Sequence, residues 1–355
     1  MRNPRDSRQE DTRLTQQPPQ HYETIAKRRN RVSRLSHTRL RRRRRILTTG
    51  GALVAIAAIA LGIVFYNNSA GNHEPLPVNL PPSSTSYLGI YTEGVPHSYS
   101  QVTAFTNATG ADPDIIMYYS GWFMPFPAGF ATTVANHGAA PLVQMDPDTV
   151  RDTAIASGQY DGYLSSYAEA VRAYNHPVIL SFGHEMNGSW SSWGYTHQSP
   201  AAFVAAWRHV VNVFRALGAR NVTWLWTVNV INDSRHAKID TLDQWWPGSS
   251  YVTWVGIDGY YLKPSWRFAP LFGPTIGAVR ALTSDPILVA ETGAVPAAGQ
   301  PAKITDLFAG IRSYGLLGFV WFDSTNTIQQ RFTIDSPAAV AAFRKGASTY
   351  RRPGS

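Results

Sequence analysis

The chain has 355 residues, 44% of them hydrophobic and 15% charged, which excludes a wholly disordered protein and leaves room for one large domain or two ordinary ones. It has no cysteine, which excludes disulfides, a thiolate nucleophile and a cysteine-ligated metal. Residues 1–45 hold 15 Lys and Arg against four acids, and the other 310 residues hold 17 basic and 19 acidic ones. The net charge of +9 therefore belongs to the N-terminus, and the near-neutral body lacks the cationic field that a nucleic-acid partner would need.

The first 66 residues have the pattern of a tail followed by a membrane anchor. Residues 1–45 are rich in Arg, Gln and Ser, and we expect a disordered cytoplasmic tail. Residues 46–66 carry no charge, and as a helix they would span roughly the 30 Å hydrocarbon core of a bilayer. The cluster Arg41–Arg45 stands directly before this span and can contact anionic lipid headgroups. The positive-inside rule then places the N-terminus in the cytoplasm and the body outside, on a single-pass signal-anchor helix.

Three other interpretations of this region remain open. The apolar span could be a buried core helix or a cleaved export signal, although no small-x-small cleavage site follows it. The arginines before Ile46-Leu47 also resemble a twin-arginine export signal, which would give a secreted protein. Residues 67–86 are rich in Pro and Ser and indicate a semi-extended linker between the span and the body.

The body, residues 87–355, has the length and pattern of a single α/β domain, a (β/α)8 TIM barrel. Helical segments alternate with short apolar runs, which indicates parallel strands buried on both faces. The clearest helix begins at Ser199-Pro200, an N-cap followed by a proline at the first helical position, and stops before Gly218. The eight predicted strands are Tyr87–Tyr91, Ile115–Tyr119, Pro141–Met145, Val178–Phe182, Val222–Val228, Val252–Ile257, Ile287–Ala290 and Leu317–Phe322.

Chemistry in such a barrel belongs at the carboxyl ends of the strands, where this chain has polar and aromatic residues. Glu185 and Glu291 follow the fourth and seventh strands at near-equivalent positions, so the closed barrel can turn both toward one mouth. Two carboxyl groups in one cleft can hydrolyse a glycoside without a metal or cofactor: one protonates the leaving oxygen, and the other attacks the sugar or activates water. Their mutual repulsion raises the pKa of one partner and keeps it protonated.

Aromatic side chains accompany the two glutamates. All 11 tryptophans lie in the body, and an aromatic ring can stack on the apolar face of a pyranose. Trp190, Trp193 and Trp321 stand next to the candidate carboxylates, and we expect them, with Trp122, to line the mouth. Core packing is expected instead for four others, which are Trp207, Trp224, Trp226 and Trp254.

The segment around Glu185 resembles a known family. Residues 177–190, PVILSFGHEMNGSW, together with Trp193-Gly194, are similar to the acid/base motif of glycoside hydrolase family 26, the endo-β-mannanase family of the large retaining (β/α)8 clan. The resemblance covers residues 87–355 and none of the first 86. Further segments that resemble the family in the same order are Ser157-Gly158, Asp161–Leu164, Trp224–Trp226, Val255–Tyr260, Ala290–Gly293 and Phe319–Phe322.

The resemblance implies roles for individual residues. It makes Glu185 the general acid/base and Glu291 the nucleophile, with Tyr260 hydrogen-bonded to the nucleophile. The expected substrate-binding residues are His184, Asn187, Trp190, Trp193, Trp122, Asn229, Tyr260 and Trp321, with Trp321 as the floor under the reacting sugar. One position departs from the family, because many members have arginine where this chain has Ser181. That difference affects the contacts to substrate rather than the two carboxylates.

These observations predict a monomeric, membrane-tethered, extracytoplasmic retaining endo-β-glycanase that hydrolyses a β-linked polysaccharide, in the first place an endo-1,4-β-mannanase. Mixed-linkage β-glucan and β-1,3-xylan are alternative substrates, and a non-catalytic carbohydrate-binding envelope protein is the alternative class. A zinc-protease motif is excluded, because the fourth residue after His184 is Gly188 instead of a second histidine. No metal or cofactor is therefore expected.

The anchor can be tested by fractionation of cells that produce the full chain. We expect the protein in the membrane fraction with Met1 retained inside, because the arginine cluster precedes the apolar span. A soluble mature protein that begins after Tyr66 would instead establish the export-signal interpretation.

Overall fold

The structure, a computed structural model, describes residue 80 and residues 86–231, 238–325 and 331–349. The expected tail (1–45), the expected membrane span (46–66) and nearly all of the linker lie outside these residues. In the part of the chain that the structure describes, no helix has the length and apolar character needed to cross a membrane.

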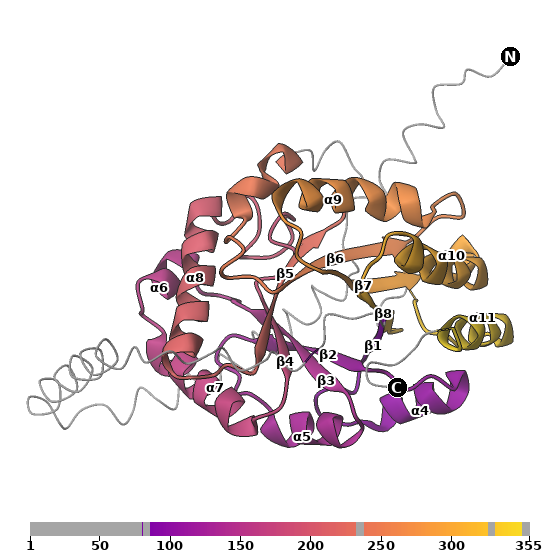
Figure 1. Cartoon of the computed structure of the whole chain (residues 1–355), viewed down its shortest axis with the longest axis horizontal. Helices are drawn as coiled ribbons and strands as arrows, with labels where there is room; N and C mark the ends of the chain where they lie inside the picture. Colours follow the sequence, from indigo (N-terminus) through magenta and orange to yellow (C-terminus); the bar gives the residue numbers. More distant parts are fainter. Residues whose placement is uncertain (1–79, 81–85, 232–237, 326–330, 350–355) are drawn as a thin grey trace, which may run out of the picture. The chain divides into compact units, whose positions relative to one another are not determined.

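Eight parallel strands form a closed barrel in which each strand pairs with the next in sequence (Figure 1). The first strand pairs with the last, with Tyr87 opposite Gly318. A Cβ atom at residue 318 would collide with the backbone of Tyr87, so glycine allows the barrel to close there. All eight predicted strands are present. Their bounds are β1 (Tyr87–Thr92), β2 (Ile115–Gly121), β3 (Ala140–Asp146), β4 (Val178–Phe182), β5 (Val222–Asn229), β6 (Trp254–Tyr261), β7 (Ile287–Ala294) and β8 (Gly318–Asp323).

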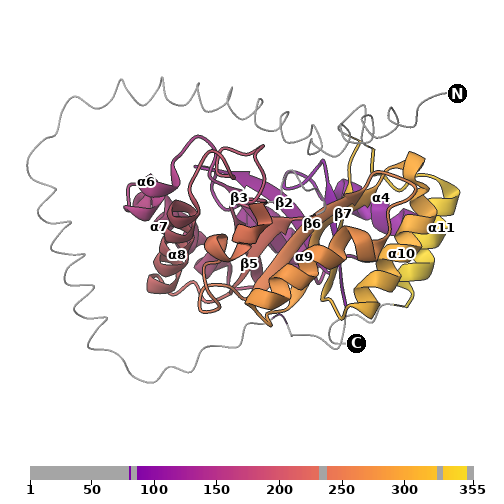
Figure 2. The same ribbon diagram turned by 90° about the horizontal axis from the view of Figure 1, so that it is seen from above.

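Helices surround the barrel (Figure 1), and the view turned by 90° shows α9 beside β6 and α11 beside α10 (Figure 2). The predicted helix after Ser199 is confirmed as α8, and the Ser199 hydroxyl accepts a hydrogen bond from the backbone N–H of Ala202. The helices are α4 (Ser100–Thr109), α5 (Ala128–Asn136), α6 (Asp152–Ala156), α7 (Asp161–Tyr174), α8 (Pro200–Ala216), α9 (Phe268–Leu282), α10 (Gln300–Ser313) and α11 (Pro337–Ala347), with 3-10 helices η1 (Lys238–Trp245) and η2 (Pro296–Ala298).

The strands are buried on both faces, as their continuous apolar sequences indicate. One apolar layer lies between strands and helices, where Phe203 and Trp207 of α8 pack against Phe182 of β4. The four tryptophans predicted for the core are all buried: Trp207, Trp224, Trp226 and Trp254. The second layer lies inside the barrel and is partly polar, and it carries the site described next.

Candidate active site

Glu185 lies in the turn that follows β4 and is almost completely buried, with 1% of its surface exposed. Gly183 and Glu185 both have left-handed backbone conformations, with φ of 57° and 54°, and the Glu185 N–H donates to Thr227 O of β5 at 2.9 Å. A glutamate with positive φ is strained, so the surrounding contacts must hold it. The turn therefore fixes the direction in which this carboxyl group points.

Two side chains bind the two oxygens of Glu185 separately. Asn229, at the end of β5, donates from Nδ2 to Oε1 at 2.6 Å, and Trp190 donates from Nε1 to Oε2 at 2.8 Å. Burial raises the pKa of Glu185 to about 7, and the nearby charge of Glu291 acts in the same direction. The positive charge of His184 and the two donors oppose this rise. Glu185 can therefore hold a proton near neutral pH and also release it.

Glu291 lies within β7, is fully buried and accepts hydrogen bonds from three other strands. Tyr119 of β2 donates to Oε1 at 2.6 Å, Gln144 of β3 donates to the same oxygen at 3.4 Å, and Tyr260 of β6 donates to Oε2 at 2.7 Å. Burial, followed by the charge of Glu291, raises the pKa of both tyrosines well above its ordinary value, so both remain donors. These three donors stabilise a negative charge on Glu291.

The pairing of β7 is irregular on both sides of Glu291. The register with β6 shifts between Gly256 and Asp258, and the register with β8 shifts between Val289 and Thr292. Such irregularities change the direction of side chains near active sites. They provide a structural reason why Glu291 can face the barrel interior at the level of the two tyrosines.

His184 adds a positive charge to the site. Its Nδ1 lies 3.0 Å from Asp146 Oδ1 at the end of β3, and both side chains are buried. Burial alone would lower the pKa of His184, but Asp146 and the two glutamates raise it to about 9. Trp193 donates from Nε1 to the backbone O of His184 at 2.7 Å and supports the turn from behind. His184 is consequently a protonated neighbour of the carboxyl pair at neutral pH.

Asp258 is a third buried carboxyl group at this level. In the barrel register it stands opposite Asn229 of β5 on one side and Glu291 of β7 on the other. Burial raises its pKa well above the ordinary value, and the charges of Glu291 and Glu185 raise it further. Both effects favour the neutral form of Asp258, which reduces the charge repulsion beside Glu291.

The structure brings several of the residues expected from the sequence to one mouth. Glu185, Glu291, His184 and Tyr260 interact there as described. Asn187 and Asn229 form a reciprocal pair in which Asn187 Nδ2 donates to Asn229 O at 2.9 Å and Asn229 N donates to Asn187 Oδ1 at 2.8 Å. Asn187 thus orients the side chain that binds Glu185, and Trp190 remains partly exposed beside the same carboxyl.

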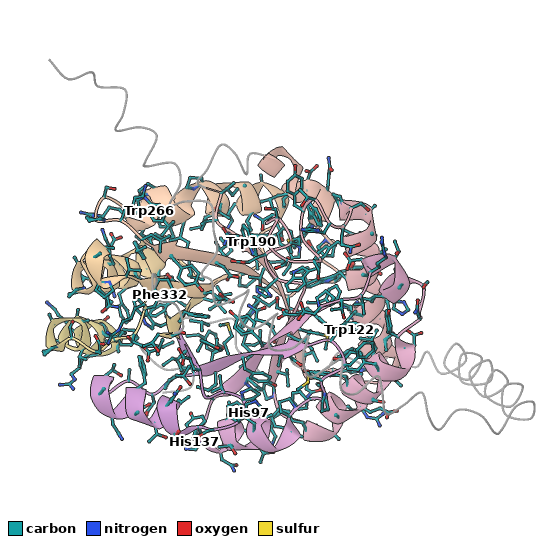
Figure 3. All side chains as sticks on the ribbon, turned by 180° about the vertical axis from the view of Figure 1, so that it is seen from behind. His97, Trp122, His137, Trp190, Trp266 and Phe332 are labelled. Atoms are coloured by element: carbon teal, nitrogen blue, oxygen red, sulfur yellow. The ribbon has the colours of Figure 1, made fainter. Side chains whose placement is uncertain are left out.

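Three of the expected stacking tryptophans are almost completely buried. Trp321 is fully buried, packs toward Phe343 of α11 and donates from Nε1 to Phe332 O at 3.0 Å, so it is not placed as a floor under a sugar. Trp193 is 4% exposed behind His184, and Trp122 is 7% exposed beside Tyr163. Figure 3 shows Trp122 and Phe332 on opposite sides of the barrel, with Trp190 between them.

Four residues of the site have no role that is predicted from the sequence: Tyr119, Gln144, Asp146 and Asp258. Each stands at or near the carboxyl end of its strand, which was the available signal, but their partners are distant in sequence. Ser181, where the family resemblance leads to an arginine, is buried and lies 3.1 Å from Thr227 through the two hydroxyl oxygens. Within the described ranges, no three or more His, Asp or Glu side chains are grouped so that they could hold a metal ion.

Comparisons with known proteins agree with this geometry. Residues 135–281, which include Glu185 and end before Glu291, match the model of "Glycosyl hydrolase family 26". The chain is 30% identical to Endoglucanase H of Acetivibrio thermocellus over 268 residues, covering 71% of this chain and 29% of that protein. It is 29% identical to a mannan endo-1,4-beta-mannosidase of Bacillus subtilis over 150 residues, covering 39% of this chain and 38% of that protein. The chain thus spans well under half the length of either relative.

Among solved structures, the catalytic domain of an endo-beta-1,4-mannanase from Bacillus sp. JAMB-750 matches with a TM-score of 0.58 at 16% identity. The match covers 75% of this chain and 86% of that one, which shows that the two share a fold. The matched family model lies within the eight-stranded barrel, which carries one glutamate after its fourth strand and another on its seventh, and it identifies residues 135–281 as a glycosyl hydrolase family 26 segment.

Proposed function

We propose that the barrel is a retaining endo-β-glycanase. The observation that carries the proposal is the unequal environment of two buried carboxyl groups in one mouth. Glu291 accepts three hydrogen bonds that stabilise its charge, whereas Glu185 holds a proton near neutral pH. One nucleophile and one proton donor are the two groups that retaining glycoside hydrolysis requires.

In the first step, Glu185 gives its proton to the glycosidic oxygen while a Glu291 oxygen bonds to the anomeric carbon. The C–O bond to the leaving sugar breaks, and a glycosyl ester forms on Glu291. In the second step, Glu185 takes a proton from water as the water oxygen bonds to the anomeric carbon and displaces Glu291. The sugar hemiacetal leaves with its original configuration, because two inversions have occurred.

The electrostatics of the pair allow Glu185 to change role between the steps. The charge of Glu291 is one of the causes that raise the pKa of Glu185. When Glu291 becomes an ester, that charge disappears, and the pKa of Glu185 falls. Glu185 then loses its proton more easily and can act as the base of the second step.

The substrate proposed first is a β-mannan, and the second candidate is a β-glucan. Similarity to a protein named as a mannan endo-1,4-beta-mannosidase supports the first. Similarity over 71% of this chain to a protein named as an endoglucanase supports the second. Turnover on a panel of β-1,4-mannan, mixed-linkage β-glucan and β-1,3-xylan decides between them, and no turnover on any of them favours a carbohydrate-binding protein. The membrane-tethered, extracytoplasmic location is part of the proposal and depends only on the sequence of residues 41–66.

An internal, endo-acting cut requires contacts beyond the reacting sugar, and Phe123 offers one. It stands two residues beyond the end of β2, is 50% exposed and has φ of 71°. Its ring packs edgewise on Tyr160 and Tyr163, with both centroid distances 5.6 Å, which holds it at the rim. Its Cα atom can lie no more than about 14 Å from that of Tyr119, because only four residues separate them. Phe123 can therefore stack on a sugar a few units from the cleavage point.

Replacing each of the two glutamates by alanine should have a different effect on hydrolysis. Glu291→Ala should abolish hydrolysis of every substrate, because no glycosyl ester can form. Glu185→Ala should still form the ester from a glycoside with an activated phenol leaving group, and azide should then restore turnover. Glu169→Ala on the exposed surface of α7 is the control and should match the wild type. Equal, unrescued loss in both glutamate variants would contradict the assignment.

The pH dependence of the reaction should report Glu185. For a natural substrate, kcat/KM should fall as the pH rises through about 7, because Glu185 loses the proton that the leaving group needs. Trp190→Phe removes a donor that stabilises the charged form, so the basic limb should move to higher pH. The measurement is the pH profile with mannan and with an activated phenyl glycoside. The phenyl glycoside should lack this limb, and an identical limb on both substrates would argue against Glu185 as the acid.

Phe123→Ala should lower kcat/KM for long oligosaccharides more than for short ones, because only long chains reach the rim. A single lost stacking contact predicts a reduction of roughly two- to tenfold. The control is Tyr314→Ala, which removes another aromatic ring, 40% exposed, at the opposite end of the barrel. It should leave kcat/KM unchanged for long and for short oligosaccharides. A uniform reduction over a manno-oligosaccharide or gluco-oligosaccharide series would rule out a distal contact at Phe123.

A further inference from the structure

Phe332 lies in the segment between β8 and α11 and is buried against the site, with 1% of its surface exposed. Its ring stacks on Tyr260 with centroids 4.7 Å apart and planes inclined at 30°. Phe322 of β8 meets Tyr260 edge-on at 5.9 Å and meets Phe332 edge-on at 6.3 Å. Tyr260 is therefore held by two aromatic rings while its hydroxyl donates to Glu291 at 2.7 Å.

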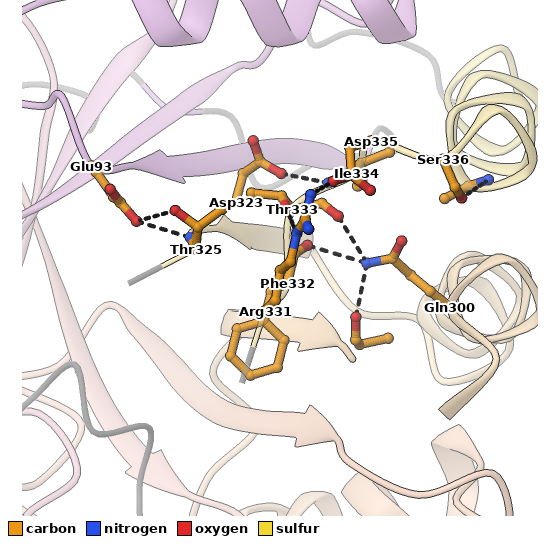
Figure 4. Close-up of polar contacts among 12 residues, drawn as sticks. Glu93, Gln300, Asp323, Thr325, Arg331, Phe332, Thr333, Ile334, Asp335 and Ser336 are labelled. Carbon is orange, nitrogen blue, oxygen red and sulfur yellow. Dashed lines mark hydrogen bonds and ion pairs between the residues drawn. The ribbon is translucent and has the colours of Figure 1, made fainter. Parts of the chain in front are cut away.

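Hydrogen bonds fix the backbone of Phe332 (Figure 4). Its carbonyl oxygen accepts from Trp321 Nε1 at 3.0 Å and from Gln300 Nε2 at 3.3 Å, and its N–H donates to Ser324 O at 3.0 Å. Gln300 Nε2 also donates at 2.8 Å to the carbonyl oxygen of Ala294, which is the last residue of β7. The segment is thus connected directly to the strand that carries the nucleophile.

Gly293, two residues after Glu291, shows how closely Phe332 approaches β7. A Cβ atom at Gly293 would lie 2.9 Å from three atoms of the Phe332 side chain, closer than real Cβ contacts. The glycine of the Glu291-Thr292-Gly293 sequence therefore makes room for the ring. Phe332 therefore makes two contacts near Glu291: its ring stacks on Tyr260, and it packs closely against β7 at Gly293.

We propose that Phe332 is a positioning residue for the nucleophile and that it acts through Tyr260. The inference rests on the proposed glycanase function. A tyrosine ring can tilt about its Cα–Cβ and Cβ–Cγ bonds, and a tilt moves the hydroxyl away from Glu291. Phe332 blocks one face of the ring and thereby keeps the hydroxyl at hydrogen-bond distance. An ordinary core phenylalanine would contribute to stability alone and would leave the chemical step unchanged.

The test is a double-mutant cycle between Phe332→Leu and Tyr260→Phe, with kcat/KM measured on an activated aryl glycoside, which reports formation of the glycosyl ester. Phe332→Leu alone should lower kcat/KM by about ten- to a hundredfold, as displaced catalytic groups do, with little change in KM. In the Tyr260→Phe background the same change should cost less than about twofold, within the range of independent effects. In that background the Tyr260 hydroxyl is already absent, so Phe332→Leu can no longer displace it from Glu291.

Phe308→Leu is the matched control. Phe308 is also 1% exposed and packs against Phe319 and Phe343, away from the site. It should lower Tm as much as Phe332→Leu but leave kcat/KM at the wild-type value. Gln300→Ala keeps the ring and removes hydrogen bonds that hold the segment, so it gives a second test if Phe332→Leu does not fold. It should also lose activity only when the Tyr260 hydroxyl is present.

The outcomes separate the two proposals. Equal losses from Phe332→Leu in both backgrounds, or an equal loss in Phe308→Leu, would overturn the positioning role. A wild type with turnover and a Phe332→Leu variant with unchanged kcat/KM would overturn it as well while leaving the glycanase function intact. A wild type without turnover on any glycan of the panel would overturn both.

Discussion

The negative charge of Glu291 has to be stabilised inside the barrel, because this side chain has no exposed surface. An isolated buried carboxylate is costly, and hydrogen-bond donors must replace the water it has lost. Tyr119, Gln144 and Tyr260 supply that replacement from three different strands. Only a closed barrel brings the ends of β2, β3 and β6 around one point of β7, so the architecture and the chemistry depend on each other.

The ionisable groups around Glu291 are arranged so that they limit charge repulsion with its carboxylate. Burial, together with the charge of Glu291, raises the pKa of Glu185 to about 7 and also raises the pKa of Asp258, which favours the neutral form of both acids. His184 carries the compensating positive charge and is held by Asp146. In the proposed mechanism, burial and the charge on Glu291 together keep the proton on Glu185, and the pKa of Glu185 falls when that charge is lost in the ester.

The sequence alone predicted the eight strands and the pair of glutamates, because apolar runs and strand-end positions are local signals. It did not predict which aromatic rings face the mouth. Successive side chains point to opposite sides of a strand, so a one-residue error in the predicted register of β8 decides whether Trp321 or Phe322 faces the barrel interior. In the structure Trp321 packs toward α11 and Phe322 stacks with Tyr91 inside the barrel. The bonds from Tyr119 and Gln144 to Glu291 join residues 172 and 147 positions apart, a separation that no local pattern encodes.

This chain has Ser181 at a position where many members of the family have arginine. An arginine inside the barrel at this position would add a positive charge close to His184, whereas the serine and Thr227 share only neutral hydroxyls. Near that position His184 Nδ1 lies 3.0 Å from Asp146 Oδ1, and Glu291 accepts hydrogen bonds from neutral donors. The transition state of glycoside hydrolysis develops positive charge on the sugar. In the proposed mechanism, the negative charge of Glu291 stabilises that sugar more than the neutral ground state, and a further cation at residue 181 would oppose this stabilisation.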